Sequence, residues 1–167
     1  EARRQKPYCA MALNWCFDEP WPAAANNSLV VYPSIAKPAL EEVRLACRPL
    51  CASARFGHFD WEEGDLFSCD LWILNDLPHG VGPFVVRATL RGDASPVQML
   101  RWESPAAEAG CNIAGPAARV RLPAWDTDRF HVELSVEGHP EMDAHYTLAY
   151  RRKAYRHDRT APMNVTE

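Results

Sequence analysis

The alternation of residue types between positions 56 and 76 constrains the fold of this chain more than any other feature. In its second half, two sets of side chains fall on opposite faces: Phe67, Cys69, Leu71 and Ile73 against Ser68, Asp70, Trp72 and Leu74. A period of two with one apolar face is typical of a β-strand that covers a core. A strand this apolar needs a second layer, which predicts one sheet packed against another.

The surrounding sequence continues this pattern. A shorter strand is expected over 54–61, and the polar, glycine-containing segment Glu62–Asp65 predicts a hairpin between the two strands. A loop of small residues is expected over 105–116, and further alternating segments lie at 84–90, 97–102, 118–122, 130–136 and 144–152. About seven short strands joined by turns indicate a mainly β chain, an immunoglobulin-like antiparallel β-sandwich.

The first fifty residues follow a different pattern. The nearly continuous apolar run 8–17 lies in an N-terminal extended segment and predicts a strand buried on both faces. Residues 37–48 predict the one short helix, with a proline in the first turn and another after the end. Its apolar face, formed by Leu40, Val43 and Cys47, is expected to dock on a neighbour. The predicted parts are therefore 1–50, a sandwich over 51–153 and a tail over 154–167.

Charge and composition narrow the classes of function. The net charge is −4 and the pI is about 5.9, which argues against nucleic acid as a partner because such binding rests on clustered Lys and Arg. No run of 18 apolar residues is present, so no membrane-spanning segment is expected. The six cysteines show no C-x-x-C spacing, so neither a metal site nor another cofactor is expected. Free thiols are favoured over disulfide bonds, and disulfide bonds stay an alternative.

The polar start of the chain carries no signal peptide, which suggests a piece cut from a longer protein. The sequence is compatible with more than one cellular compartment: a cytoplasmic location is favoured, and a secreted or periplasmic one is the alternative.

Asp18 and Glu19, flanked by Trp15 and Trp21, are the most obvious catalytic candidates. Paired carboxylates cleave glycosidic bonds, and aromatic rings stack on sugars. Adjacent residues of an extended segment usually point apart, however, whereas a retaining pair faces each other at about 5 Å. The alternative is a structural loop in which the carboxylates accept hydrogen bonds from backbone donors and the tryptophans pack.

The other candidate sites also have structural alternatives. His131 and His145 could face each other across paired strands and bind a metal, although exposed sheet faces carry such residues routinely. Trp72 is expected on the outer face of its strand, where it would serve either a glycan or a domain interface. No nucleophile elbow and no phosphate-binding glycine motif occur.

Two stretches resemble glycoside hydrolase family 2, the group of β-galactosidases, β-mannosidases and β-glucuronidases. Residues 12–50, ALNWCFDEPWPAAANNSLVVYPSIAKPALEEVRLACRPL, are similar to the last strand of the family's catalytic barrel, its tryptophan-containing turn and the helix that leaves the barrel. Residues 59–78, FDWEEGDLFSCDLWILNDLP, are similar to the opening hairpin of the sandwich domain that follows. Asp18 stands where relatives commonly carry Asn.

This resemblance implies that the two catalytic glutamates belong to earlier barrel strands upstream of Glu1, and no residue here matches either one. It also implies that Trp15 could line the sugar pocket of the full enzyme. The partner would be the upstream catalytic barrel of the parent chain.

Three hypotheses follow. The leading one is a non-catalytic C-terminal accessory sandwich of a family 2-type glycosidase, inactive by itself. The second is a carbohydrate-binding module that holds a glycan through exposed Trp and Tyr. The third is a free-standing hydrolase that uses Asp18 and Glu19. If the run 8–17 lacks barrel neighbours, it is expected to add to a sheet edge, to pair with a second copy or to stay poorly ordered.

Overall fold

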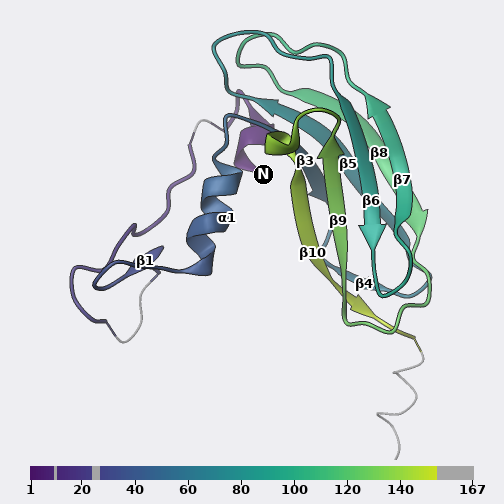
Figure 1. Cartoon of the computed structure of the whole chain (residues 1–167), viewed down its shortest axis with the longest axis horizontal. Helices are drawn as coiled ribbons and strands as arrows, with labels where there is room; N and C mark the ends of the chain where they lie inside the picture. Colours follow the sequence, from purple (N-terminus) through teal and green to yellow (C-terminus); the bar gives the residue numbers. More distant parts are fainter. Residues whose placement is uncertain (10, 24–26, 154–167) are drawn as a thin grey trace, which may run out of the picture. The chain divides into compact units, whose positions relative to one another are not determined.

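The computed structural model describes residues 1–9, 11–23 and 27–153. The chain forms two compact units, Glu1–Pro49 and Leu50–Glu167 (Figure 1). The predicted tail over 154–167 lies outside the described residues. Among the residues that are described, no helix is long and apolar enough to cross a membrane.

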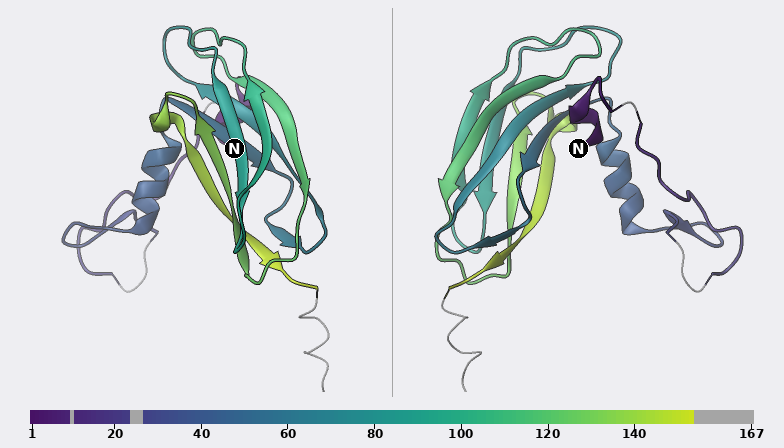
Figure 2. Two further views of the ribbon diagram at one scale, coloured as in Figure 1. Left: turned by 45° about the vertical axis from the view of Figure 1, so that its right-hand side comes forward. Right: turned by 180° about the vertical axis from the view of Figure 1, so that it is seen from behind.

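The second unit is a sandwich of two sheets, as the alternating pattern predicts (Figure 2). One sheet has three strands in the order β3 (Leu50–Phe56), β5 (Leu66–Asn75), β8 (Ile113–Arg121). The other has five, in the order β4 (Asp60–Glu62), β10 (Ala144–Arg151), β9 (Arg129–Val136), β6 (Val85–Arg91), β7 (Val97–Glu103). A short 3-10 helix, η2 (Pro140–Met142), precedes β10. Neighbouring strands are antiparallel except β4 and β10, which are parallel. The mainly β, sandwich-like fold class is confirmed.

The core of the sandwich is built from the apolar faces of the central strands. Phe67, Leu71 and Ile73 of β5 are 0% exposed and Cys69 is 1% exposed. The opposing sheet supplies a similar row of buried apolar side chains. It includes Phe130, whose ring packs edge-on against that of Phe67 with 5.3 Å between the ring centroids. Burial of each such side chain contributes about 1.5–3 kcal/mol. The period of two in the sequence therefore reports the two faces of β5 correctly as far as Ile73, whereas Leu74, on the other face, is buried as well at 4% exposure.

The predicted hairpin at Glu62–Asp65 is wrong. β3 ends at Phe56, the chain crosses to the other sheet, and β4 pairs there with β10, Trp61 opposite Tyr150. The neighbours of β5 are β3 and β8. Trp61 explains the crossing, because its side chain is buried between the sheets with its ring 4.9 Å from that of Phe67.

The predicted loop over 105–116 is also too long, because β8 begins at Ile113. Small residues remain compatible with a strand at this point, since the ring of Trp102 lies directly above Gly115. A Cβ on Gly115 would sit 2.7 Å from that ring and 2.9 Å from the Leu71 carbonyl oxygen. Close packing, and not a loop, accounts for the glycine.

The first unit contains little regular structure. Its elements are η1 (Ala2–Gln5), the antiparallel two-residue strands β1 (Val30–Val31) and β2 (Ile35–Ala36), and helix α1 (Pro38–Ala46). The helix confirms its prediction, with Lys37 as N-cap and Pro38 at its first position. No residue of α1 is buried, and the docking of its apolar face on a neighbour stays a prediction.

The strand predicted over 8–17 is also wrong. The described residues of this run form no strand, and the nearest pairing is a single bridge between Asp18 and Val30. A strand exists through its ladder of hydrogen bonds to neighbours, and apolar side chains alone do not supply that ladder. The run therefore stays irregular.

Candidate functional site

Glu19 is the anchor of the loop that carries the sequence-predicted site. Its side chain is buried at 7% exposure, and the Ser28 hydroxyl donates a hydrogen bond to its Oε1 at 3.0 Å. The Lys37 ammonium lies 3.7 Å from the same oxygen and donates to the Ser28 hydroxyl at 3.1 Å. A buried carboxylate is stable only when it is paired and hydrogen-bonded in this way. Glu19 therefore has a structural role here.

Backbone hydrogen bonds fix the same loop to the start of the short hairpin. The Glu19 amide donates to the Val30 carbonyl at 3.1 Å, and the Lys37 amide donates to the Leu29 carbonyl at 2.9 Å. The Phe17 carbonyl accepts from the amides of both Leu29 and Val30. The segment from Phe17 to Glu19 is thus held at several points although it is not a strand.

Asp18 is exposed whereas Glu19 is buried. The two adjacent carboxylates therefore lie in different environments, as the geometry of an extended segment requires. This arrangement does not offer the facing pair that glycoside hydrolysis needs. It agrees with the structural interpretation of the pair.

The flanking aromatic residues remain uncovered. Trp15 is 83% exposed and Trp21 is 67% exposed, and the peptide bond between Trp15 and Cys16 is cis. They belong to a larger group, here called the exposed apolar set, whose members are Tyr8, Met11, Leu13, Trp15, Phe17, Trp21, Tyr32 and Ile35. Such a group can stack on sugar rings or pack against another protein surface.

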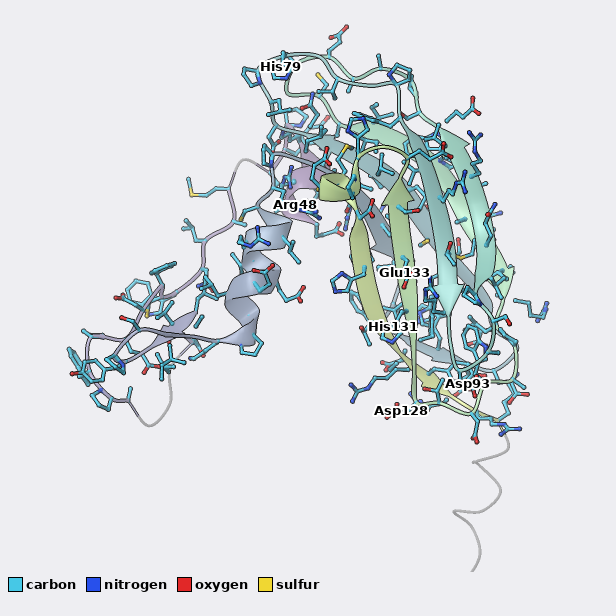
Figure 3. The ribbon with its side chains drawn as sticks, viewed as in Figure 1. Arg48, His79, Asp93, Asp128, His131 and Glu133 are labelled. Atoms are coloured by element: carbon cyan, nitrogen blue, oxygen red, sulfur yellow. The ribbon has the colours of Figure 1, made fainter. Side chains whose placement is uncertain are left out.

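The histidines do not form the predicted pair. His131 of β9 lies opposite Thr147, and its Nδ1 is 3.0 Å from the Thr147 hydroxyl, whereas His145 lies opposite Glu133. Glu133 in turn pairs with Arg91 at 2.6 Å. Figure 3 shows His131 and Glu133 along β9, on the face of the five-stranded sheet that does not form the core. Within residues 1–9, 11–23 and 27–153 no group of three or more His, Cys, Asp or Glu side chains could hold a metal ion.

A cleft in the sandwich was not predicted from the sequence. It has a volume of about 360 Å³ and is lined by Arg55, Gly57, Trp61, Ser68, Cys69 and Asp70. Burial, together with the nearby Asp70 carboxylate, raises the pKa of the Cys69 thiol to about 12, so this group is a neutral, inert part of the wall. The signal in the sequence was one charged residue in each of two otherwise apolar strands, Arg55 and Asp70, but only the strand register shows that they are cross-strand neighbours.

Trp72 lies on the other face of β5 from the core residues, opposite Ser53 of β3 and Ala114 of β8, and is half-buried. The six cysteines are free thiols.

Comparison with known proteins gives only weak similarities. No protein-family model matches the sequence, and no curated protein is significantly similar to it. Among solved structures, the alkylpurine DNA glycosylase AlkC of Pseudomonas fluorescens aligns with 65% of this chain and 32% of its own, at 10% identity and a TM-score of 0.43. The superoxide reductase (neelaredoxin) of Ignicoccus hospitalis aligns with 60% of this chain and 80% of its own, at 8% identity and a TM-score of 0.41.

The sporulation control protein Spo0M of Bacillus subtilis aligns with 62% of this chain and 50% of its own, at 10% identity and a TM-score of 0.40. This chain thus spans about a third of the length of the glycosylase. At TM-scores below 0.5 these similarities carry no argument about function. No comparison tests the resemblance to family 2, which stays a prediction from the sequence.

Proposed function

We propose that this chain is the non-catalytic C-terminal part of a family 2-type glycoside hydrolase, which cleaves β-glycosidic bonds through a barrel in the same polypeptide. In this proposal residues 1–50 are the remnant of the barrel end with its linker helix, and the sandwich is an accessory domain. The resemblance of residues 12–50 and 59–78 to that family supports the assignment. So does the state of the two carboxylates, because Glu19 is committed to Ser28 and Lys37.

The observation that carries the proposal is the distribution of exposed apolar side chains. Among the described residues, nine of the eleven large apolar side chains that are exposed lie in the first unit, and only Phe59 and Leu66 lie in the sandwich. Large exposed apolar side chains that gather in one part of a chain can mark a protein interface, and aromatic residues are enriched in the buried centre of such interfaces. The sandwich encloses its own core, so the uncovered surface belongs to the first unit.

The anchoring of the loop makes this surface suited to docking. The Glu19 network and the backbone hydrogen bonds to Leu29 and Val30 hold the short segment from Phe17 to Glu19, at the end of the run 8–17, before any partner binds. A preorganised segment loses less conformational freedom on docking. Burial of each aromatic side chain would contribute about 1.5–3 kcal/mol. A barrel that lacks its last strand would supply both the missing ladder of hydrogen bonds and the apolar cover.

The test uses the full natural polypeptide and its coding sequence. Upstream of the Glu1 codon we expect the sequence of a barrel with two glutamates at strand ends. In the full enzyme, we expect Trp15→Ala to lower kcat/KM on aryl β-glycosides at least ~10-fold, because the substrate would be misplaced in the sugar pocket. Phe59→Ala is the matched control, since Phe59 is an exposed aromatic residue of the sandwich, at 67% against 83% for Trp15. The activity of the Phe59→Ala enzyme should equal that of the wild type.

Three results would overturn the proposal. They are turnover of aryl β-glycosides by residues 1–167 alone, an upstream sequence without a barrel, and unchanged activity of the Trp15→Ala enzyme. A second copy of this chain is the competing occupant of the exposed apolar set. Concentration-dependent dimerisation of residues 1–167 that is lost when Trp15 and Phe17 are replaced by Ser would show that a second copy covers this set, and would count against the barrel as its natural cover.

A further inference from the structure

The cleft of the sandwich forms where one strand leaves its sheet. The last paired residues of β3 and β5 are Phe56 and Cys69, and beyond them residues 66–68 of β5 have no partner in β3. The chain turns away at Gly57 to reach the other sheet, where Trp61 is buried. The space left beside the uncovered part of β5 is the cleft of about 360 Å³. It is therefore a consequence of the topology.

Polar groups of complementary kinds line this space. Arg55 and Asp70 are cross-strand partners in register, and a bulge in the pairing of β5 with β8 follows Asp70. Bulges redirect side chains and are frequent beside functional sites. Within the described residues, the side chains of Arg55, Ser68 and Asp70 make no hydrogen bond or ion pair with another residue. A guanidinium, a hydroxyl and a carboxylate are thus available to a ligand in one place.

We propose that this cleft binds a neutral saccharide. Vicinal sugar hydroxyls both donate and accept hydrogen bonds, so they match a guanidinium that only donates beside a carboxylate that only accepts. The two charges balance, which removes the preference for an anionic or a cationic ligand that a single charge would create. The inference is independent of the proposed barrel, because none of these residues belongs to the first unit.

The wall and the size of the cleft agree with this ligand class. Trp61 lines it and is stacked by His58, with ring centroids 3.7 Å apart and an interplanar angle of 29°. Rigid aromatic walls with a few convergent polar groups are typical of ligand sites, whose volumes run from about 300 to 1,000 Å³. The cleft lies at the lower end of that range, which suits a mono- or disaccharide.

Gly57 provides a sharp test. A Cβ on Gly57 would meet nothing within 4 Å, and its φ lies outside the region that strains other residues. The substitution Gly57→Leu should therefore fill the cleft without displacing the backbone. Arg55→Ala and Asp70→Ala remove the two charged groups singly. Arg151→Ala is the control, since this arginine is exposed on β10, in the other sheet.

Binding is measured by NMR titration of the isotopically labelled full chain with glucose, galactose, mannose and their β-linked disaccharides, with glucuronate and glucosamine as charged comparators. For at least one neutral sugar we expect saturable shifts of the Ser68 and Asp70 amides with a millimolar Kd. Arg55→Ala and Asp70→Ala should each weaken binding ~10-fold or more, Gly57→Leu should abolish it, and Arg151→Ala should leave it unchanged.

The proposal is overturned if no neutral sugar shifts these amides, if Gly57→Leu binds as well as the wild type, or if a charged comparator binds more tightly than every neutral sugar. The result is separable from the test of the barrel. Saturable sugar binding with no barrel upstream would refute only the enzyme assignment, and a barrel upstream with an unresponsive cleft would refute only the saccharide site.

Discussion

The hydroxyl of Tyr150 ties the connection between β8 and β9 to the last strand. It donates a hydrogen bond to the Pro123 carbonyl at 2.6 Å and accepts one from the Trp125 amide at 3.2 Å. The ring itself packs 5.6 Å from that of Trp125 and 6.4 Å from that of Phe130. The substitution Tyr150→Phe keeps these ring contacts and removes both hydrogen bonds, so it isolates the contribution of the hydroxyl.

The two lost hydrogen bonds are not equivalent. Pro123 is exposed, so water can satisfy its carbonyl, whereas Trp125 is 1% exposed and its amide would lose its partner inside the protein. An unsatisfied buried donor costs about 1–3 kcal/mol, and we expect the free energy of unfolding to fall by that amount. Urea denaturation followed by tryptophan fluorescence measures it as a lower midpoint with an unchanged slope. Tyr32→Phe, at an exposed tyrosine of the first unit, should lose less than ~0.5 kcal/mol.

The difference in stability between the wild type and Tyr150→Phe also depends on pH. Burial raises the pKa of Tyr150 in the folded protein above its ordinary value, so the folded state favours the protonated phenol. That contribution is fully present below the unfolded pKa of about 10 and is lost as pH rises through the folded pKa. The stability gap between wild type and Tyr150→Phe should therefore narrow above about pH 10. A gap below ~0.5 kcal/mol at neutral pH, or one that widens with alkali, would refute this account of the hydroxyl.

Three further outcomes can be checked directly. Cys69, with its pKa of about 12 and 1% exposure, should not react with a thiol reagent at pH 8 in the native state, whereas exposed Cys47 should; modification of Cys69 without unfolding would contradict its burial. Gly115→Ala should destabilise the sandwich by about 1–3 kcal/mol through overpacking against Trp102, and an unchanged urea midpoint would show that the ring can move away. Ser28→Ala should speed amide hydrogen exchange at Glu19 by loosening its network, while Asp18→Asn, at an exposed carboxylate, should leave that exchange as it is.

The strands that could be predicted are those whose signal is local. In β5 and β9 every second side chain enters the core, so the requirement for apolar residues at these buried positions produces the period of two in the sequence. The position of β4 could not be predicted in the same way. Its partner β10 lies far along the chain, and nothing near Trp61 reports a parallel pairing with Tyr150. Pairing between distant segments depends on tertiary packing, which a local pattern does not record.

The site was partly predictable for the same reason. Adjacency in an extended segment was enough to expect that Asp18 and Glu19 would separate, and one is exposed and the other buried. The partners of Glu19 were not foreseeable, because Ser28 and Lys37 reach it only through the turn that carries β1 and β2. The opposition of Arg55 and Asp70 likewise exists only once β3 and β5 are aligned.

The two units leave different kinds of surface for a partner, and this difference separates the two proposals. Trp125 in the sandwich is 1% exposed and Trp15 in the first unit is 83% exposed, although both are tryptophans in irregular segments. The sandwich has two sheets to enclose its aromatic residues, whereas the first unit has one short helix and two-residue strands. Aromatic rings that the unit cannot enclose would be stabilised most by packing against an apolar protein surface, because removal of apolar area from water is favourable. The cleft is lined instead by the charged side chains of Arg55 and Asp70, which a dry apolar partner would leave without hydrogen-bond partners. A hydroxyl-rich ligand would satisfy them, and so the two proposals assign the protein partner to the first unit and the sugar to the second.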